Sequence, residues 1–331
     1  MAIAPTAAPA GTPAPRGRRA RFTPQRALFF LLFLGVPLTV YIVFVVSPFL
    51  QAFYYSMTDW RGLARAPQFI GFDNYTRLFN DPVFRRAVLN NMIYMIVLPT
   101  VTISLAFALA ILVTIGGNSR GQVRGISGAN IYRVVSFFPY VIPAVVVGIL
   151  FAFIYSPNGG LLNGMLNLLA TPLNAVGMDI PTINTGWLGS RDWARWAIMA
   201  AVIWSLVGFY MVLFVAAIKA VPAEVVEAAR LDGAGRFRLS VQVVLPMIRE
   251  NVSTALVYMG ILALDMFVYI RVMTPSGGTG KSTEVVSRYL YETAFSQSRF
   301  GLASAMGVVM ALITMLMAVL VIFGFRRGGN T

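Results

Sequence analysis

Side chains able to do acid–base or nucleophilic chemistry are scarce in this sequence. Its 331 residues include 12 aspartates and glutamates, no histidine and no cysteine. The absence of His and Cys excludes thiolate nucleophiles, disulfides, iron–sulfur clusters and histidine-ligated metals. A single acidic residue, Asp265, falls within a segment apolar enough to cross a membrane. We therefore expect no catalytic residue, no metal site and no cofactor in this chain.

A glycine-rich segment, Gly277–Thr283, has the sequence Gly-Gly-Thr-Gly-Lys-Ser-Thr and resembles a phosphate-binding loop. Such a loop also needs a glycine five residues before Gly280, where this chain has Pro275. It must also follow a strand and open a helix in the compartment that contains ATP. Here the segment follows an apolar span on the expected outer face, so we do not expect it to bind nucleotide.

The overall composition is typical of an integral membrane protein. Hydrophobic residues make up 58% of the chain and charged residues 11%, whereas soluble domains carry about 25% charged residues. The formal net charge is +14. In so apolar a chain we expect the basic residues to orient the protein in the bilayer, not to bind nucleic acid.

Six segments have roughly the 20 mostly apolar residues that a spanning helix needs. They are residues 27–50, 92–115, 134–155, 196–218, 251–273 and 300–325. The predicted fold class is therefore all-α integral membrane with six transmembrane helices. An even number of spans places both termini on one side, and the arginine-rich stretch before the first span favours the cytoplasm. Residues 1–26 are expected to be a disordered basic leader and residues 328–331 a short cytoplasmic tail.

The segment between the fourth and fifth spans, residues 219–250, is expected in the cytoplasm as two short helices. Pro222 suits a first helical turn, and Ala223–Leu231 is rich in helix-forming residues. Glycines at 233 and 235 let the chain bend before a second helix over Arg236–Val244. In the first helix, Glu224, Glu227 and Leu231 are three and four residues apart and therefore lie on one face.

This loop carries a motif that resembles the signature of permease subunits of ABC importers, EAA-x3-G-x9-I-x-L-P. The matching residues are Glu227, Ala228, Ala229, Gly233, Val243, Leu245 and Pro246, with valine where isoleucine is usual. Segments 69–75, 81–84 and 291–295 also resemble the carbohydrate-type, MalF/UgpA-like permeases, so the resemblance covers residues 27–327. One departure is Thr274–Gly278, which replaces the Thr-Gly-Gly-Gly-Pro that is frequent in the family.

The resemblance implies the type I importer permease fold and a subunit that hydrolyses nothing itself. Its cytoplasmic loop is expected to dock as a coupling helix on a separate ABC ATPase, present in two copies, which binds the ATP and Mg. Further implied partners are a second six-span permease, giving a heterodimer, an extracytoplasmic solute-binding protein and membrane lipid. The implied location is the bacterial plasma membrane, and the implied cargo is a sugar or sugar derivative.

The docking residues implied by the motif include Glu227 for a polar contact, Ala228 and Ala229 for close approach, and Gly233 for the bend. An ordinary helix stop is the alternative role for Gly233. The full set of expected docking residues is Glu227, Ala228, Ala229, Leu231, Asp232, Gly233, Leu245 and Pro246.

Candidates for the substrate path are the polar and aromatic residues inside the fourth and fifth spans, because such groups usually face a cavity or another helix. Aromatic rings can stack on sugars, and Asp265 can accept hydroxyl hydrogen bonds. The alternatives are helix packing for the aromatic and methionine residues and an ion pair with Arg271 for Asp265. The candidates are Trp204, Ser205, Phe209, Tyr210, Tyr258, Asp265 and Met266.

Two other functions stay open at this point. An ion-gradient-driven secondary transporter would be expected to have paired intramembrane carboxylates, whereas this chain offers Asp265 alone. Within the ABC class, the cargo could instead be a non-sugar solute such as a glycerol phosphodiester or a polyol.

Overall fold

The computed structural model describes residues 24–62, 66–115, 125–126 and 128–327. These residues form helices, and the only β-type pairing among them is a single bridge between Thr58 and Phe69. This agrees with the predicted all-α class. Most of the predicted leader and all of the predicted tail lie outside the described residues.

The first of two compact units comprises Met1–Gln51. Its described part is one continuous helical run, in which α-helical stretches alternate with two π-helical turns. The elements are α1 (Pro24–Phe30), η1 (Leu31–Gly35), α2 (Val36–Tyr41), η2 (Ile42–Val46) and α3 (Ser47–Ser56), whose end belongs to the second unit. Leu28–Ser56 of this run has a mean hydropathy of 2.7, which is high enough for a membrane span.

The second unit, Ala52–Thr331, contains the remaining helices. The longer ones are α5 (Pro82–Ile115), α6 (Ala129–Val141), α7 (Ala144–Ile154), α8 (Leu161–Ala175), α9 (Ala194–Lys219), α13 (Arg249–Leu264) and α16 (Phe300–Arg327). The shorter ones are α4 (Asp73–Asn80), α10 (Ala223–Leu231), α11 (Arg236–Arg238), η3 (Leu239–Val244), α12 (Leu245–Met247), α14 (Phe267–Met273), η4 (Thr279–Lys281), α15 (Val286–Tyr291) and η5 (Glu292–Ser296).

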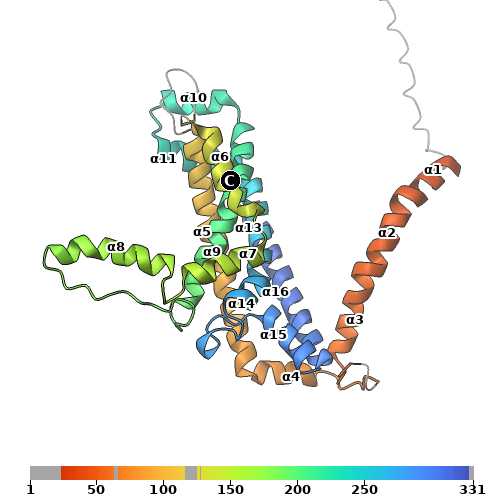
Figure 1. Cartoon of the computed structure of the whole chain (residues 1–331). Helices are drawn as coiled ribbons and strands as arrows, with labels where there is room; N and C mark the ends of the chain where they lie inside the picture. Colours follow the sequence, from red (N-terminus) through yellow and green to blue (C-terminus); the bar gives the residue numbers. More distant parts are fainter. Residues whose placement is uncertain (1–23, 63–65, 116–124, 127, 328–331) are drawn as a thin grey trace, which may run out of the picture. The chain divides into compact units, whose positions relative to one another are not determined.

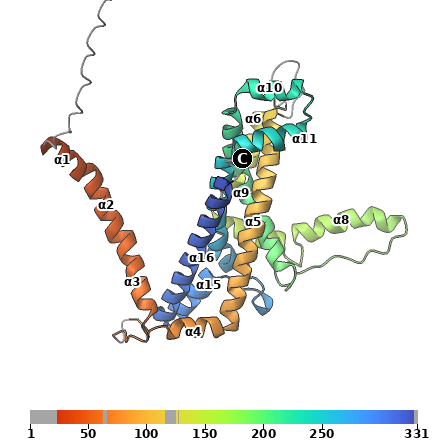
Figure 2. The same cartoon turned by 180° about the vertical axis from the view of Figure 1, so that it is seen from behind.

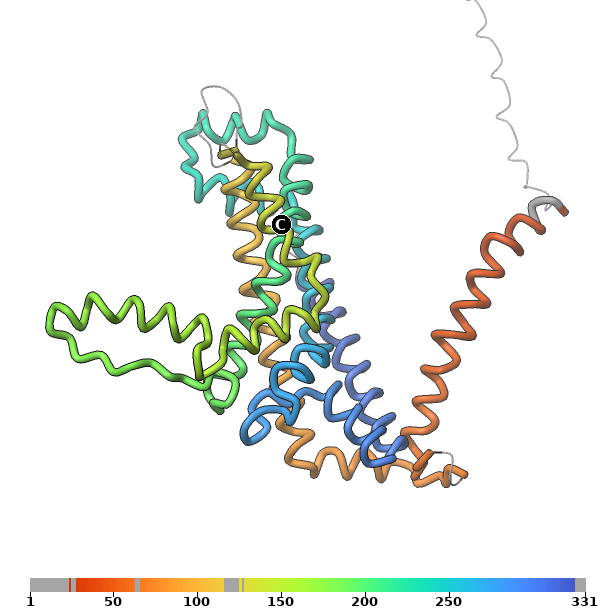
Figure 3. Tube along the Cα trace, in the orientation of Figure 1, coloured from red at the N-terminus to blue at the C-terminus, as the bar shows by residue number. Residues whose placement is uncertain are grey.

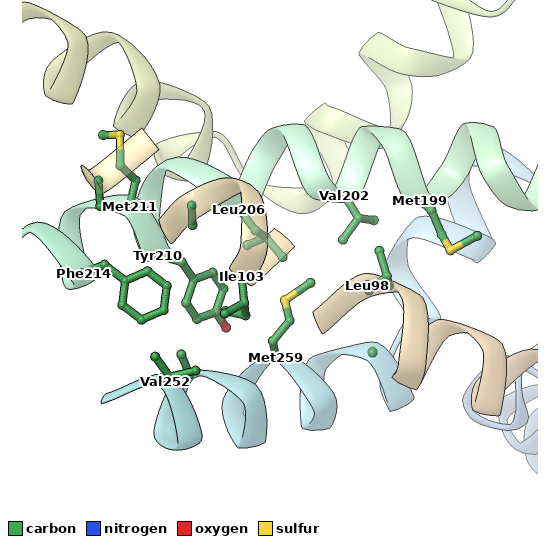
Figure 4. Packing of buried hydrophobic residues seen from close by; sticks show 14 of the residues in the cluster. Leu98, Ile103, Met199, Val202, Leu206, Tyr210, Met211, Phe214, Val252 and Met259 are labelled. Carbon is green, nitrogen blue, oxygen red and sulfur yellow. The ribbon is translucent and has the colours of Figure 1, made fainter. Parts of the chain in front are cut away.

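The core of this unit lies where α5, α9 and α13 pack against one another. Figure 4 shows Phe214 and Tyr210 of α9 near Val252 and Met259 of α13. Helix α6 packs on the other side of α9 at very close range. A Cβ atom on Gly208 would lie 1.7 Å from the backbone oxygen of Ser136, so this helix crossing requires glycine.

Among the described residues, four helices are long and apolar enough to span a membrane, and the count reaches up to six if each of two bent pairs is one span. The four single helices agree with the predicted first, second, fourth and sixth spans, although α5 begins ten residues earlier than expected. The predicted third span, residues 134–155, falls on one of these bent pairs. It is divided into α6 and α7, bent by 97° at Ile142 and Pro143, because the residue before proline is driven out of the helical conformation.

The predicted fifth span is also bent, by 43°, between α13 and α14. The break falls at Asp265 and Met266. Its polar residue therefore lies at an interruption of the helix, where backbone groups are free to bond to other partners.

The second unit has two clearly different ends. Helices α10 and α11 lie at one end of the bundle and α4 and α15 at the other, in both views (Figures 1 and 2). Helix α8 and the segment that follows it project sideways from the bundle between these ends (Figure 3).

Candidate functional site: the loop helix and the polar face of α13

Helix α10 lies within the predicted cytoplasmic loop and has the predicted bounds, Ala223–Leu231. It follows Pro222 directly, and Glu224 in its first turn is favourable for the helix dipole. It ends in a Schellman motif. Gly233 N–H donates to Arg230 O at 3.0 Å and Ala234 N–H to Ala229 O at 2.9 Å, with Gly233 at φ 80°.

One face of α10 is attached to the bundle. Val226 is buried among core residues, and Ala229 packs against the same cluster. Arg230 donates from Nη2 to the backbone oxygen of Ile115, the last residue of α5, at 3.3 Å. Because positions 226, 229 and 230 are spaced three and four apart, they form a single inward stripe.

The opposite face of α10 is exposed. Glu224, Glu227, Ala228 and Leu231 project away from the bundle, and Leu231 is 89% exposed. A large apolar side chain so exposed, beside two carboxylates, is typical of a docking surface for a protein. The structure separates the two alanines of the motif, since Ala228 lies on this exposed face and Ala229 on the attached one.

The second half of the loop resumes a helix at Arg236 and continues as far as Met247. Leu239 and Val244 are buried, and Leu245 packs against the core, whereas Pro246 is exposed. Phe237 is 81% exposed and joins Leu231 as a second projecting apolar side chain of this loop. Sequence reasoning did not single out Phe237, although its position two residues after Gly235 places it at the start of the new helix.

Several predicted substrate-path residues are buried inside the bundle. Ser205 donates to Val202 O and lies 3.2 Å from the hydroxyl oxygen of Tyr269. Phe209 stacks on Tyr140 of α6, with ring centroids 4.5 Å apart. The fully or nearly buried members of the predicted set are Ser205, Tyr210 and Met266. Their environment is that of helix packing.

Other predicted residues are exposed along one face of α13. Tyr258 is 65% exposed, and Asp265 is also exposed. Five exposed residues that are three or four positions apart share this face: Asn251, Thr254, Tyr258, Ile261 and Asp265. Polar groups in a spanning segment are costly against lipid, so this stripe is suited to a water-filled path or a second subunit.

Asp265 and Arg271 do not pair. No ion pair between them occurs in the part of the chain that the structure describes, and the guanidinium carbon of Arg271 lies 5.8 Å from the centroid of the Tyr291 ring. Trp204, the remaining candidate, is partly exposed and packs edge to face on Phe151 of α7 at 5.3 Å.

The segments that resemble carbohydrate-type permeases lie at the other end of the unit and have structural roles there. Asp81 caps α5, because its Oδ1 accepts the N–H of Val83 at 2.7 Å and Pro82 is the first helical residue. Tyr289 donates to Asp81 Oδ2, and burial together with this hydrogen bond raises the pKa of Tyr289 above its ordinary value. Asn74 donates to the backbone oxygens of Ser56 and Thr58.

The glycine-rich loop is organised around a buried ion pair between Glu284 and Arg288. Lys281 Nζ lies 3.2 Å from Glu284 Oε2 and donates to the backbone of the same loop. Burial lowers the pKa of Arg288, but the hydrogen bond and charge of Glu284 raise it, and the net shift is upward. A Cβ atom on Gly277 would lie 2.4 Å from Glu284 Oε2, so the glycine makes room for this carboxylate.

The helical, strongly apolar architecture agrees with one family of membrane transport proteins. Residues 106–327 match the family described as binding-protein-dependent transport system inner membrane component. The chain belongs to this family. It is therefore a membrane permease subunit and not an enzyme.

Individual relatives support the same assignment. The chain is 48% identical to the diacetylchitobiose uptake system permease protein NgcF of Streptomyces coelicolor, over 99% of this chain and 91% of the relative. It is 29% identical to the multiple sugar-binding transport system permease protein MsmF of Streptococcus mutans, over 87% and 92%.

A solved structure confirms the fold. The match is to the crystal structure of a bacterial alginate ABC transporter in complex with an alginate pentasaccharide-bound periplasmic protein, with a TM-score of 0.76. It covers 93% of this chain and 97% of that one at 23% identity. The type I permease fold predicted from the sequence is thus confirmed, as is a multi-pass membrane location.

Proposed function

We propose that this chain is one permease subunit of an ATP-driven importer for a di- or oligosaccharide or a related sugar derivative. The observation that carries the proposal is the 48% identity, over nearly the whole chain, to the permease of a diacetylchitobiose uptake system. Other relatives belong to lactose and sulfoquinovosyl glycerol transport systems. Relatives at 48%, 28% and 27% identity thus all belong to transport systems for sugars or sugar derivatives. An N-acetylated disaccharide is the first cargo to test.

Helix α10 is the coupling element in this proposal. Its exposed face would dock on a cytoplasmic ATPase, and its buried face would pass the movement to α5 and to the bundle core. The support is the division of the helix into an attached stripe containing Val226 and an exposed stripe containing Glu227. ATP can shift the inward–outward equilibrium only if the ATPase contacts differ between the two states.

The polar face of α13 is our candidate for the translocation path. It would face a second permease subunit across a water-filled cavity, with Tyr258 stacking on a sugar ring and Asp265 accepting a hydroxyl hydrogen bond. This role is supported by the exposure of both side chains in a spanning segment. Among the buried candidates, Ser205 and Tyr210 are assigned to packing instead.

The proposed topology counts each bent helix pair as one span, which gives six spans. The α10 end of the bundle and both chain termini would lie in the cytoplasm, and the α4 end outside, where a solute-binding protein delivers the sugar. The support is the arginine cluster before the first span.

The test is purification of the tagged chain in mild detergent, followed by mass spectrometry and reconstitution into vesicles. The proposal expects an ATPase, a second permease and a solute-binding protein to co-purify, and ATP to drive uptake of the sugar that the binding protein carries. Recovery of this chain alone after cross-linking, with uptake driven by an ion gradient, would overturn it.

A further inference from the structure

The segment between α7 and α9 forms an arm that projects from the bundle (Figure 3). It consists of α8, Leu161–Ala175, and an extended return segment, residues 176–193. From residue 156 to residue 190 the chain has one ionisable residue, Asp179, and two more, Arg191 and Asp192, follow at the base of the arm. A projection of this size that carried only water-facing surface would be expected to be richer in charge.

Three asparagines fasten α8 to the return segment. Asn167 donates to the backbone oxygen of Ile183 at 3.0 Å and accepts its N–H at 2.7 Å. Asn174 makes the same two bonds with Ile180, at 3.0 and 2.8 Å. Asn163 donates to Thr185 O at 3.0 Å. The asparagines thus lie on one face of α8, and the paired bonds hold the arm in one shape.

The arm is also fastened to the bundle at its base. Asn163 accepts the indole N–H of Trp187 at 2.8 Å, and Tyr155 donates to Ala197 O in α9 at 3.0 Å. Thr279 of the glycine-rich loop donates to Gly189 O at 2.7 Å. The Asn163–Trp187 bond closes α8 on its return segment, the Tyr155–Ala197 bond joins α7 to α9 beside the arm, and the Thr279–Gly189 bond joins the return segment to the bundle.

The face of α8 opposite the asparagines is apolar and exposed. Leu168 and Leu169 are 73% and 67% exposed. Because each residue of an α-helix is rotated by about 100° from the one before, five exposed side chains share this face. They are Leu161, Met165, Leu168, Leu169 and Leu173. Monomeric soluble surfaces rarely leave such a continuous apolar face uncovered.

The apolar face points toward the α10 end of the bundle. In both views the return segment lies on the α4 side of α8 (Figures 1 and 2). The asparagines face the return segment, so the leucines on the opposite face of α8 point toward the α10 end. Helix α9 also runs toward the α10 end from the base of the arm. Its 26 residues are about 39 Å long, enough to cross a hydrocarbon core of about 30 Å.

Tryptophans mark the level at which the arm leaves the bundle. Trp187 and Trp193 lie 5.6 Å apart in an edge-to-face arrangement, and Trp196 follows in the first turn of α9. Trp193 and Trp196 are both exposed. Exposed tryptophans are enriched where spanning helices meet the headgroup region, so the base of the arm lies at a membrane–water interface.

We propose that α8 lies in the plane of the outer membrane–water interface, with its leucine face among the lipid acyl chains and its return segment toward water. Two features favour lipid over a protein as the occupant. The preceding helix, α7, also carries exposed apolar side chains, which include Ile149 and Phe153. The near absence of charge also suits burial against acyl chains and offers little to orient a protein partner.

In this arrangement the arm is an in-plane anchor. The arm connects α7 to the start of α9. Its contact with lipid would therefore fix the depth of these two helices in the membrane while other helices move. The inference rests on the membrane orientation proposed above, with α10 in the cytoplasm.

The test uses single cysteines, because the chain has none of its own. The variants are Leu168→Cys and Leu169→Cys on the leucine face, with Asn184→Cys on the exposed return segment as the matched control. Each is labelled with the fluorophore NBD in the complete transporter, in vesicles of phosphatidylethanolamine and phosphatidylglycerol. Quenching by nitroxide-labelled lipid and by iodide, an aqueous quencher, is measured with and without the solute-binding protein.

The proposal expects the labels at 168 and 169 to be quenched by lipid at least threefold more strongly than the label at 184, whether or not the binding protein is present. Equal quenching at the three positions would overturn it. Protection of 168 and 169 from aqueous quencher only when the binding protein is added would assign the face to a protein and also overturn it. Sugar uptake by the same variants is measured in parallel, so a failure of the anchor is distinguished from a failure of the transport function.

Discussion

Arg230 of α10 and Ile115 of α5 are joined by a hydrogen bond of 3.3 Å from the guanidinium Nη2 to the backbone oxygen. Ile115 is the last residue of its helix, so its carbonyl has no partner within α5 and is free to accept this bond. Together with the buried Val226, the bond ties the loop helix to a spanning helix. The loop helix is therefore attached directly to the end of α5.

The first prediction concerns the charge on that exposed face. Glu227→Lys should lower sugar uptake at least about tenfold, corresponding to about 1.4 kcal/mol of lost coupling, while the permease still inserts. Glu227 is exposed and has no structural role in the described bundle, so folding should be unaffected. The measurement is uptake into vesicles together with the amount of ATPase that co-purifies.

The matched control for this charge reversal is Asp192→Lys. Asp192 is an exposed acidic residue just before the start of α9, whereas α10 follows the other end of that helix. This variant should retain the ATPase at the wild-type level. Normal ATPase recovery and normal uptake in Glu227→Lys would contradict the docking role.

The second prediction compares two glycines of the loop. Gly233→Ala should destabilise the end of α10 by about 1–2 kcal/mol, because an alanine is unfavourable at positive φ. The cost is conformational, since nothing lies within 4 Å of the added Cβ. Faster hydrogen exchange in α10 and reduced uptake are the expected observations.

Gly235→Ala is the control, because Gly235 has φ −65° and an equally open surrounding. Gly235 is the N-cap of α11, where alanine costs about 0.5–1 kcal/mol relative to glycine, but the end of α10 and its hydrogen exchange should remain unchanged. Identical hydrogen exchange in the two variants would show that the Schellman turn does not hold α10.

The loop was the part of the molecule that its sequence predicted most fully. Local signals were sufficient there: a proline before the helix, a glycine after it and a three-four spacing that separates Val226 from Glu227. The different environments of Ala228 and Ala229 needed the structure, because only the position of the bundle determines which face of α10 is attached. The break of the third span was signalled by Pro143, whose effect on Ile142 outweighed the apolar run around it.

The third prediction concerns the buried ion pair at the α4 end. Arg288→Met should destabilise the permease by about 3–5 kcal/mol, because it leaves the carboxylate of Glu284 buried with a weaker partner in Lys281. The double variant Glu284→Gln with Arg288→Met should regain a substantial part of this loss. Thermal unfolding in detergent measures both, and equal unfolding temperatures for wild type and Arg288→Met would exclude the role.

The fourth prediction separates path residues from packing residues. Tyr258→Ala should lower uptake severalfold while changing stability by less than about 0.5 kcal/mol, because this side chain is exposed. Tyr210→Ala should instead cost about 3–5 kcal/mol of stability through lost packing of a buried ring. Tyr258→Phe, which keeps the aromatic face, should retain most of the uptake.

The outcome that would contradict this division is specific. Unchanged uptake in Tyr258→Ala, with the complex intact, would remove the face of α13 from the path. The sequence placed Tyr210 and Tyr258 in one candidate set because both are aromatic residues within spans. Burial alone distinguishes them, and burial depends on helix packing that no local pattern encodes. The asparagine hydrogen bonds of the arm were missed for the same reason. The partner of Asn167 lies 16 residues away in the sequence, and that of Asn163 lies 22 residues away.

Docking of α10 on the ATPase is tested most directly by photo-cross-linking from two adjacent positions of this helix. Ala228→Cys and Ala229→Cys are each modified with a benzophenone maleimide in the otherwise cysteine-free chain, and the assembled transporter is irradiated. If α10 docks on the ATPase, position 228 on the exposed face should give a strong cross-link to the ATPase, and position 229 on the attached face a much weaker one. An intact, transporting complex in which neither position cross-links to the ATPase would contradict it.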